Sequence, residues 1–250
     1  YCRKIGQSLT KVDKNMENLL HRSKVIDRQM DGLILVAPRI QRDELVAIAD
    51  RIPTTVIGLH LPDQSSFDTV NNDDRSGAEL AVRHLHEAGH RNIAYFSLIL
   101  PGDPEATTVV QRELGYRDAM KDLGLDPQIK VVKAPPTARE TQNAARQLLR
   151  SRGRPDAIFC WTDFIALEVL SVARELGLSV PGDLAIVGYD NVWLCDLAQN
   201  ALTSIDQSGQ VLGLQAARLL TERIKGREGA EHFVVSPRLV ARSSSEPPRA

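Results

Sequence analysis

The segment from His86 to His90 reads His-Glu-Ala-Gly-His and is the most explicit chemical pattern in the chain. It matches H-E-x-x-H, in which two histidines one helical turn apart bind zinc beside a glutamate that acts as general base. That chemistry requires the helix to continue through the second histidine. Gly89 instead predicts a left-handed helix end, which turns His90 off the face of His86. The other histidines show no spacing that nominates a third ligand. We therefore expect helix-end histidines and no metal.

A second candidate site lies where predicted strands end. Phe159 and Trp161 close one apolar run, and Asp190 follows another. Arg112 begins a predicted helix after a loop that contains Gly and Pro. Ligands of open parallel sheets bind at the carboxyl ends of the strands, where helix N-termini and backbone amides line a crevice. Trp161 at such an end favours a stacking platform for a sugar face or a planar ring.

Each of these residues also has a structural alternative. Asp163 follows the Trp161 strand and could simply cap the next helix. Arg112 could be a solvated helix residue, and Trp161 could belong to the core. Asp190 is the hardest to explain structurally, because no evident helix follows it at once.

Other catalytic and nucleotide-binding signatures are missing from the sequence. It contains no G-x-S-x-G elbow, no G-x-x-x-x-G-K-[ST] loop and no G-x-G-x-x-G turn after a strand. We therefore expect a protein that is not an enzyme and needs no cofactor.

The composition is that of an ordinary globular protein. The 250 residues include 31 basic and 32 acidic side chains and are 42% hydrophobic. No apolar run approaches the roughly 20 residues of a membrane span. The sequence also has no block of Lys and Arg residues of the kind that would indicate a nucleic-acid-binding surface. The three cysteines form no CxxC pair, which argues against a disulfide framework and favours a reducing cytoplasm.

Short apolar runs alternate with amphipathic stretches, which predicts an α/β fold with parallel sheets covered by helices. Several runs are apolar without alternation, as in strands buried on both faces. The predicted strands are 32–36, 55–58, 69–71, 92–97, 130–133, 157–161, 184–189, 202–205 and 238–241. The predicted helices are 15–29, 42–51, 75–88, 112–123, 138–151, 164–176 and 209–225, and we expect 243–248 to be frayed.

Several segments resemble the effector-binding domain of the LacI/GalR family of bacterial transcription regulators. The most specific is PGDLAIVGYDN at Pro181–Asn191, preceded by Thr162–Leu167 and Arg174–Leu178. Asp31–Leu35, His84–Arg91 and Leu202–Ile205 extend the likeness over nearly the whole chain.

The resemblance implies two doubly wound lobes of the periplasmic-binding-protein-like type I, with a ligand cleft between them. We expect 1–90 and 206–228 in the N-terminal lobe, 91–205 and 229–245 in the C-terminal lobe, and 246–250 as a frayed tail. Family members begin with a helix-turn-helix headpiece and a first strand and helix, which we expect to be missing here.

The resemblance also implies roles for individual residues. Arg112 corresponds to an arginine that clamps ligand hydroxyls or a carboxylate, and Asp190 to an aspartate that accepts hydrogen bonds from the ligand. Phe159 and Trp161 correspond to the aromatic wall. Thr162 and Asp163 stand where the family usually has Asn-Asp, so Thr162 is a departure. For the second-lobe contact of a homodimer, we expect Leu167, Leu170 and Cys195.

The expected function is a cytoplasmic effector sensor for a small polar metabolite, with operator DNA bound only through the missing headpiece. A periplasmic sugar-binding protein of a transport system is the alternative, and upstream sequence would distinguish the two. A zinc hydrolase is a third class, which elemental analysis would detect. We expect a ligand held between Arg112 and Asp190, and an Arg112→Ala variant that loses affinity with its fold intact.

Overall fold

The computed structural model describes residues 30–61, 63–99 and 107–246. The helix predicted at 15–29 lies outside these residues. The described chain forms two compact units, which we treat separately. None of its helices is long and apolar enough to cross a membrane.

The smaller unit comprises the chain up to Val70 and residues Gly213–Phe233. Its four-stranded sheet has the order β1-β2-β3-β9. Leu45 packs against Val56 and Phe67 in its core. Its elements are β1 (Leu33–Val36), α2 (Arg42–Ala49), β2 (Thr54–Ile57), most of β3 (Asp68–Asn72), most of α7 (Gly209–Ile224) and the start of β9 (His232–Val235).

The larger unit comprises residues Asn71–Leu212 and the chain from Val234. Its six-stranded sheet has the order β10-β8-β7-β6-β4-β5, parallel except for β10. The strands are β4 (Ile93–Leu98), β5 (Lys130–Ala134), β6 (Ala157–Cys160), β7 (Ala185–Tyr189), β8 (Thr203–Asp206) and β10 (Arg238–Val240). The helices are α3 (Asp74–Glu87), α4 (Thr108–Asp122), α5 (Ala138–Arg150) and α6 (Asp163–Glu175), with short 3-10 turns η2 (Asp126–Gln128) and η3 (Trp193–Asp196).

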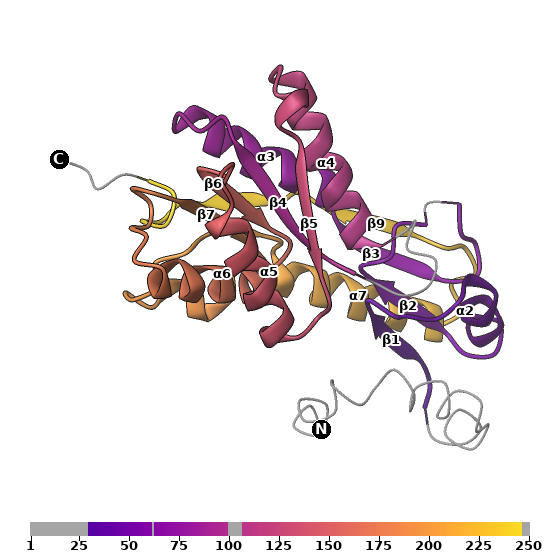
Figure 1. Cartoon of the computed structure of the whole chain (residues 1–250). Helices are drawn as coiled ribbons and strands as arrows, with labels where there is room; N and C mark the ends of the chain where they lie inside the picture. The colour runs from indigo at the N-terminus through magenta and orange to yellow at the C-terminus, as the bar shows by residue number, and fades with distance from the viewer. Residues whose placement is uncertain (1–29, 62, 100–106, 247–250) are drawn as a thin grey trace. The chain divides into compact units, whose positions relative to one another are not determined.

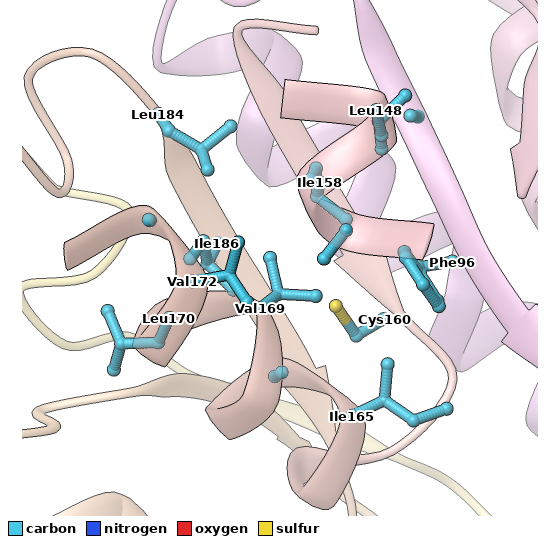
Figure 2. Packing of buried hydrophobic residues seen from close by; sticks show 14 of the residues in the cluster. Phe96, Leu148, Ile158, Cys160, Ile165, Val169, Leu170, Val172, Leu184 and Ile186 are labelled. Atoms are coloured by element: carbon cyan, nitrogen blue, oxygen red, sulfur yellow. The ribbon is translucent and has the colours of Figure 1, made fainter. Parts of the chain in front are cut away.

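Successive residues of these strands point to opposite faces, and both faces are covered (Figure 1). Phe96 faces α5 and α6, where it joins Ile158, Val169 and Ile186 in the cluster of Figure 2. Tyr95, one residue earlier, faces α3 and α4. Burial on both sides explains why the strands are continuously apolar, and the predicted α/β class is confirmed.

The two units do not divide the chain where the predicted lobes do. The expected boundary falls after residue 90, whereas the observed units separate after Val70. The reason is α3, whose fully buried Ala78, Val82 and Leu85 pack in the same cluster as Tyr116 of α4. This helix therefore belongs to the larger unit.

The C-terminal segment remains packed against the larger unit up to Ser245, beyond the point where we expected it to fray. Ser244 and Ser245 are 2% and 0% exposed, so the prediction that they are frayed is wrong. The Ser244 hydroxyl donates to the Ile186 carbonyl at 2.6 Å and accepts from the Thr203 amide at 2.8 Å. Ser245 contacts the His84 ring at 2.7 Å. These bonds satisfy backbone groups of β7 and β8, which holds the segment in place.

The residues expected at a dimer contact lie largely inside the larger unit. Leu170 and Cys195 are 2% and 0% exposed, and both belong to the cluster between α6 and the sheet. Leu167 is half-buried against the same cluster. A side chain without exposed surface has none to offer a second copy, so Leu170 and Cys195 are corrected to core residues.

Candidate functional site

The carboxyl edge of the six-stranded sheet gathers several polar side chains. Trp161, Asp190 and Gln207 follow β6, β7 and β8 directly, and these three strands are parallel neighbours. Their side chains therefore emerge at one edge. Arg112, in the second turn of α4, reaches the same edge. The structure thus brings together three predicted site residues, namely Arg112, Trp161 and Asp190.

Arg112 is the centre of this cluster and is only 3% exposed. Its Nε donates to Asp74 Oδ1 at 2.7 Å, and its Nη1 donates to the Trp161 carbonyl at 2.6 Å. Nη1 also lies 3.5 Å from Asp190 Oδ1. The guanidinium carbon is 3.5 Å from the centroid of the Tyr189 ring and 5.7 Å from that of Trp161. Ion pairing and cation–π contact together fix this side chain.

Asp190 sits in a strained turn. Its φ is 103° and that of Asn191 is 52°, both in the range that non-glycine residues rarely adopt. The Asp190 amide donates to the Ile205 carbonyl at 2.8 Å, and the Asn191 amide donates to the Ser204 hydroxyl at 3.0 Å. Arg242 donates to the Asn191 side-chain oxygen at 2.9 Å. These bonds hold the turn in a shape that aims the Asp190 carboxylate at Arg112.

Burial dominates the electrostatics of this site. It raises the pKa of Asp190 to about 7, although Arg112 acts in the opposite direction. Burial also raises the pKa of the Tyr189 hydroxyl above its ordinary value. For Arg112, burial alone would lower the pKa, but Asp74 overcomes that effect and raises it. Arg112 is therefore always charged, whereas Asp190 can gain or lose a proton near neutral pH.

Two residues that contact Arg112 or Tyr189 each carry a buried polar atom without a hydrogen-bond partner among the described residues. The atoms are the Nε1 donor of Trp161 and the Oδ1 acceptor of Asn72. The other end of the Asn72 amide donates to the Tyr189 hydroxyl. Unsatisfied buried groups are rare in folded proteins, and ligand sites are one of the places where they occur. Trp161 Nε1 can donate to a polar ligand, and Asn72 Oδ1 can accept from one.

The remaining predicted ligand residues occupy supporting positions. Phe159 is fully buried, with its ring centroid 5.1 Å from that of Tyr95 and 6.4 Å from that of Tyr189. Thr162 is the N-cap of α6 and accepts from the Ile165 amide at 3.4 Å. A direct ligand contact for these two remains a prediction.

Asp163 is fully buried and holds neighbouring segments together. Its Oδ1 accepts from the Ser204 hydroxyl at 2.6 Å and its Oδ2 from the Val192 amide at 2.8 Å. Burial raises the pKa of this carboxyl group, against the effect of these hydrogen bonds. Both carboxylate oxygens of Asp163 accept hydrogen bonds from residues next to the Asp190 turn, so Asp163 supports that turn. A direct contact between Asp163 and a ligand remains a prediction.

Arg112 and Asp190 contact one another directly, with 3.5 Å between Nη1 and Oδ1. A ligand held by this pair remains a prediction. The buried contact with Asp74 also means that Arg112→Ala would not leave the fold untouched.

Four residues of this cluster were not predicted as site residues: Asn72, Asp74, Tyr189 and Gln207. Gln207 donates to Asp190 Oδ1 at 3.1 Å. Its place after β8 is the same signal that identified Asp190, so the strand-end rule would have found it. Asp74 is the first residue of α3, and no sequence signal shows that it faces Arg112.

The zinc-like pattern forms no metal site in the described residues. Helix α3 ends at Glu87, and Gly89 has a φ of 99°. The predicted helix end is confirmed. No group of three or more His, Cys, Asp or Glu side chains in the described part of the chain is arranged to hold a metal ion.

Comparison with known proteins defines the class of this fold. Residues 82–245 match the family of periplasmic binding protein-like domains. The chain belongs to this family.

The relatives specify the class further. The chain is 31% identical to the HTH-type transcriptional repressor PurR of Klebsiella pneumoniae, over 98% of this chain and 71% of that protein. A LacI transcriptional regulator from a Rhodococcus species has a TM-score of 0.83 at 30% identity, covering 92% of this chain and 83% of the other. The complex of the regulator CelR with cellobiose has a TM-score of 0.78 at 29% identity, covering 91% and 69%. The LacI/GalR resemblance is confirmed, and the relatives favour a ligand-sensing regulator over a transport protein.

Proposed function

We propose that the larger unit binds a small polar metabolite at the Arg112 site and that this binding controls the DNA affinity of a transcription regulator. The observation that carries the proposal is the buried contact between Arg112 and Asp190 at the carboxyl edge of the sheet, where Trp161 also follows its strand. The unsatisfied Nε1 of Trp161 and Oδ1 of Asn72 support it, since an ion pair alone does not account for them.

Sugars are the first class of effector to test. Solved relatives include CelR with cellobiose and an Enterococcus faecium LacI family regulator with bound ribose, the latter 26% identical with a TM-score of 0.80. The flat ring of Trp161 suits a sugar face, and Arg112 with Asp190 suits its hydroxyls.

The proposed mechanism is thermodynamic linkage. An effector that binds one conformation of the regulator better than another shifts the population, typically by about 1 to 3 kcal/mol of coupling. We propose that the regulator is a cytoplasmic homodimer without catalytic activity. DNA would be contacted through a helix-turn-helix segment outside these 250 residues.

Calorimetry with a panel of sugars and purines tests the site. Arg112→Lys keeps the charge but loses the planar set of donors, so affinity for the responding compound should fall at least about tenfold. Arg139→Ala is the matched control, because its side chain is 85% exposed. Equal affinity of the folded Arg112→Lys variant and the wild type would remove Arg112 from the binding site.

A further inference from the structure

The turn after β7 holds a conformation that its own residues disfavour. Asp190 and Asn191 have φ values of 103° and 52°, where a side chain meets the backbone. Two consecutive residues of this kind persist only where the surrounding contacts over-determine them. The contacts that fix this turn therefore also fix the direction of the Asp190 side chain.

The side-chain amide of Asn191 is held at both ends. Its Oδ1 accepts from Arg242 Nη2 at 2.9 Å, and its Nδ2 donates to Asp206 Oδ2 at 3.4 Å. The same oxygen of Asp206 accepts from Arg238 at 2.8 Å. Arg238 begins β10 and Arg242 follows this strand, so the C-terminal segment acts on both ends of the amide.

Arg242 is the better anchored of the two arginines. Its side chain is 15% exposed, against 72% for Arg238. Its Nη1 donates to the Leu202 carbonyl at 2.8 Å, its Nε to Asp196 Oδ1 at 3.1 Å, and its backbone amide to the Thr203 hydroxyl at 2.8 Å. The planar guanidinium thus joins the turn after β7 to η3 and to the start of β8, which a single ammonium group cannot do with the same fixed geometry.

We propose that Arg242 is a positioning residue of the Arg112 site, which acts through Asn191 to hold the Asp190 carboxylate beside Arg112. The inference rests on the proposed function of that site. The action of Arg242 is indirect, because it fixes the neighbour of Asp190 and this neighbour fixes the carboxylate.

Titration of the Asp190 carboxyl carbon by NMR in the full chain tests this without any effector. The Asp190 resonance is the one that disappears in Asp190→Asn. Burial raises its pKa to about 7, Arg112 acts in the opposite direction, and the carboxylates of Asp163 and Asp74 raise it further. A turn released into water would lose this burial, so the pKa would fall toward about 3.9.

Two substitutions separate positioning from charge. Arg242→Lys keeps the charge and loses the planar set of donors, and Arg242→Gln loses both. Positioning predicts that Asp190 titrates at about pH 6 or below in each folded variant. Loss of charge alone would raise the pKa in Arg242→Gln and leave it unchanged in Arg242→Lys.

Arg146→Lys is the matched control. Arg146 donates from Nε and Nη2 to Glu175 at 3.0 and 2.8 Å, on helices α5 and α6 of the same unit. The same loss of a planar set of donors at this place should leave the titration of Asp190 at its wild-type value.

Asn191→Ala tests the route from Arg242 to Asp190. It removes the amide that Arg242 contacts and keeps a side chain at the disfavoured φ, so it should lower the pKa of Asp190 by itself. Adding Arg242→Lys to it should then change the titration little. This variant also decides the question should Arg242→Lys not fold, as circular dichroism would show.

Each contrary result removes one step. An unchanged or raised Asp190 pKa in the folded Arg242 variants would overturn positioning by Arg242. An unchanged pKa in Asn191→Ala would overturn the route through Asn191. A wild-type Asp190 that titrates at about pH 4 would show that the turn is not held against the sheet, which overturns both. None of these results depends on an effector, so a failure of sugars and purines to bind would count against the proposed function alone.

Discussion

Replacing Asp190 with Asn should make the protein more stable at about pH 8 and leave its stability nearly unchanged at about pH 4. Burial raises the pKa of Asp190 to about 7 in the folded state. In the unfolded chain the value is about 3.9. Between these two values the folded state holds a proton that the unfolded state has released, so the wild type loses stability as the pH rises through this window. Asn cannot ionise and does not incur this loss.

The magnitude follows from the size of the shift. Three pKa units correspond to about 4 kcal/mol at 1.36 kcal/mol per unit. This is an upper limit, since the Asp190 side chain retains 19% exposure and lies 3.5 Å from Arg112. We expect the variant to exceed the wild type by about 2 to 4 kcal/mol above pH 7.

Urea titrations followed by circular dichroism at a series of pH values measure this difference. Asp126→Asn serves as control, because Asp126 is exposed in η2 and should give a curve parallel to that of the wild type. Parallel curves for Asp190→Asn and the wild type would refute the idea that this carboxyl group is held protonated by burial. A gain that appears at acid pH would refute it as well, since the sign would then be reversed.

Three further predictions concern the residues that support the site. Arg112→Ala should lower the free energy of unfolding by about 3 to 5 kcal/mol because it removes the guanidinium that contacts the buried Asp74 at 2.7 Å, and adding Asp74→Ala should recover part of the loss in urea titrations. Asn191→Ala should be about 1 kcal/mol less stable than Asn191→Gly, since both lose the side chain but only Ala is strained at a φ of 52°. Gly188→Ala should lower the melting temperature, because its Cβ would clash with Asp163 Oδ1.

Each of these three predictions has an experimental result that would contradict it. Additive losses in the Arg112 and Asp74 double variant would mean that the two residues are not coupled. Equal stability of the Ala and Gly variants at position 191 would show that the turn relaxes without cost. A wild-type melting temperature for Gly188→Ala would show that β7 and Asp163 separate easily.

The fold was predictable because its signals are local. Continuous apolar runs such as Ala185–Val187 identify strands buried on both sides, and Gly89 identifies a helix end that disqualifies the zinc pattern. Ser244 and Ser245 were misread for the opposite reason. A serine-rich terminus has the composition of a frayed end, and only the tertiary partners in β7 and β8 explain its burial.

The site was predictable only in part. Arg112, Trp161 and Asp190 follow from the strand-end rule and the family likeness. Asp74 does not, since it is 38 residues from Arg112 and meets it only because α3 and α4 pack on the same face of the sheet. Burial is likewise a tertiary property, so no pattern in the chain indicates that the Asp190 carboxyl group titrates near neutral pH.

The buried segment from β10 to Ser245 delays completion of the larger unit during protein synthesis. Strand β10 closes the sheet beside β8, and it leaves the ribosome after the other strands of that sheet. Until then β8 is an unpaired edge, which invites association with other chains. A truncated translation product ending before residue 234 would therefore carry every residue of the Arg112 cluster and still not assemble it.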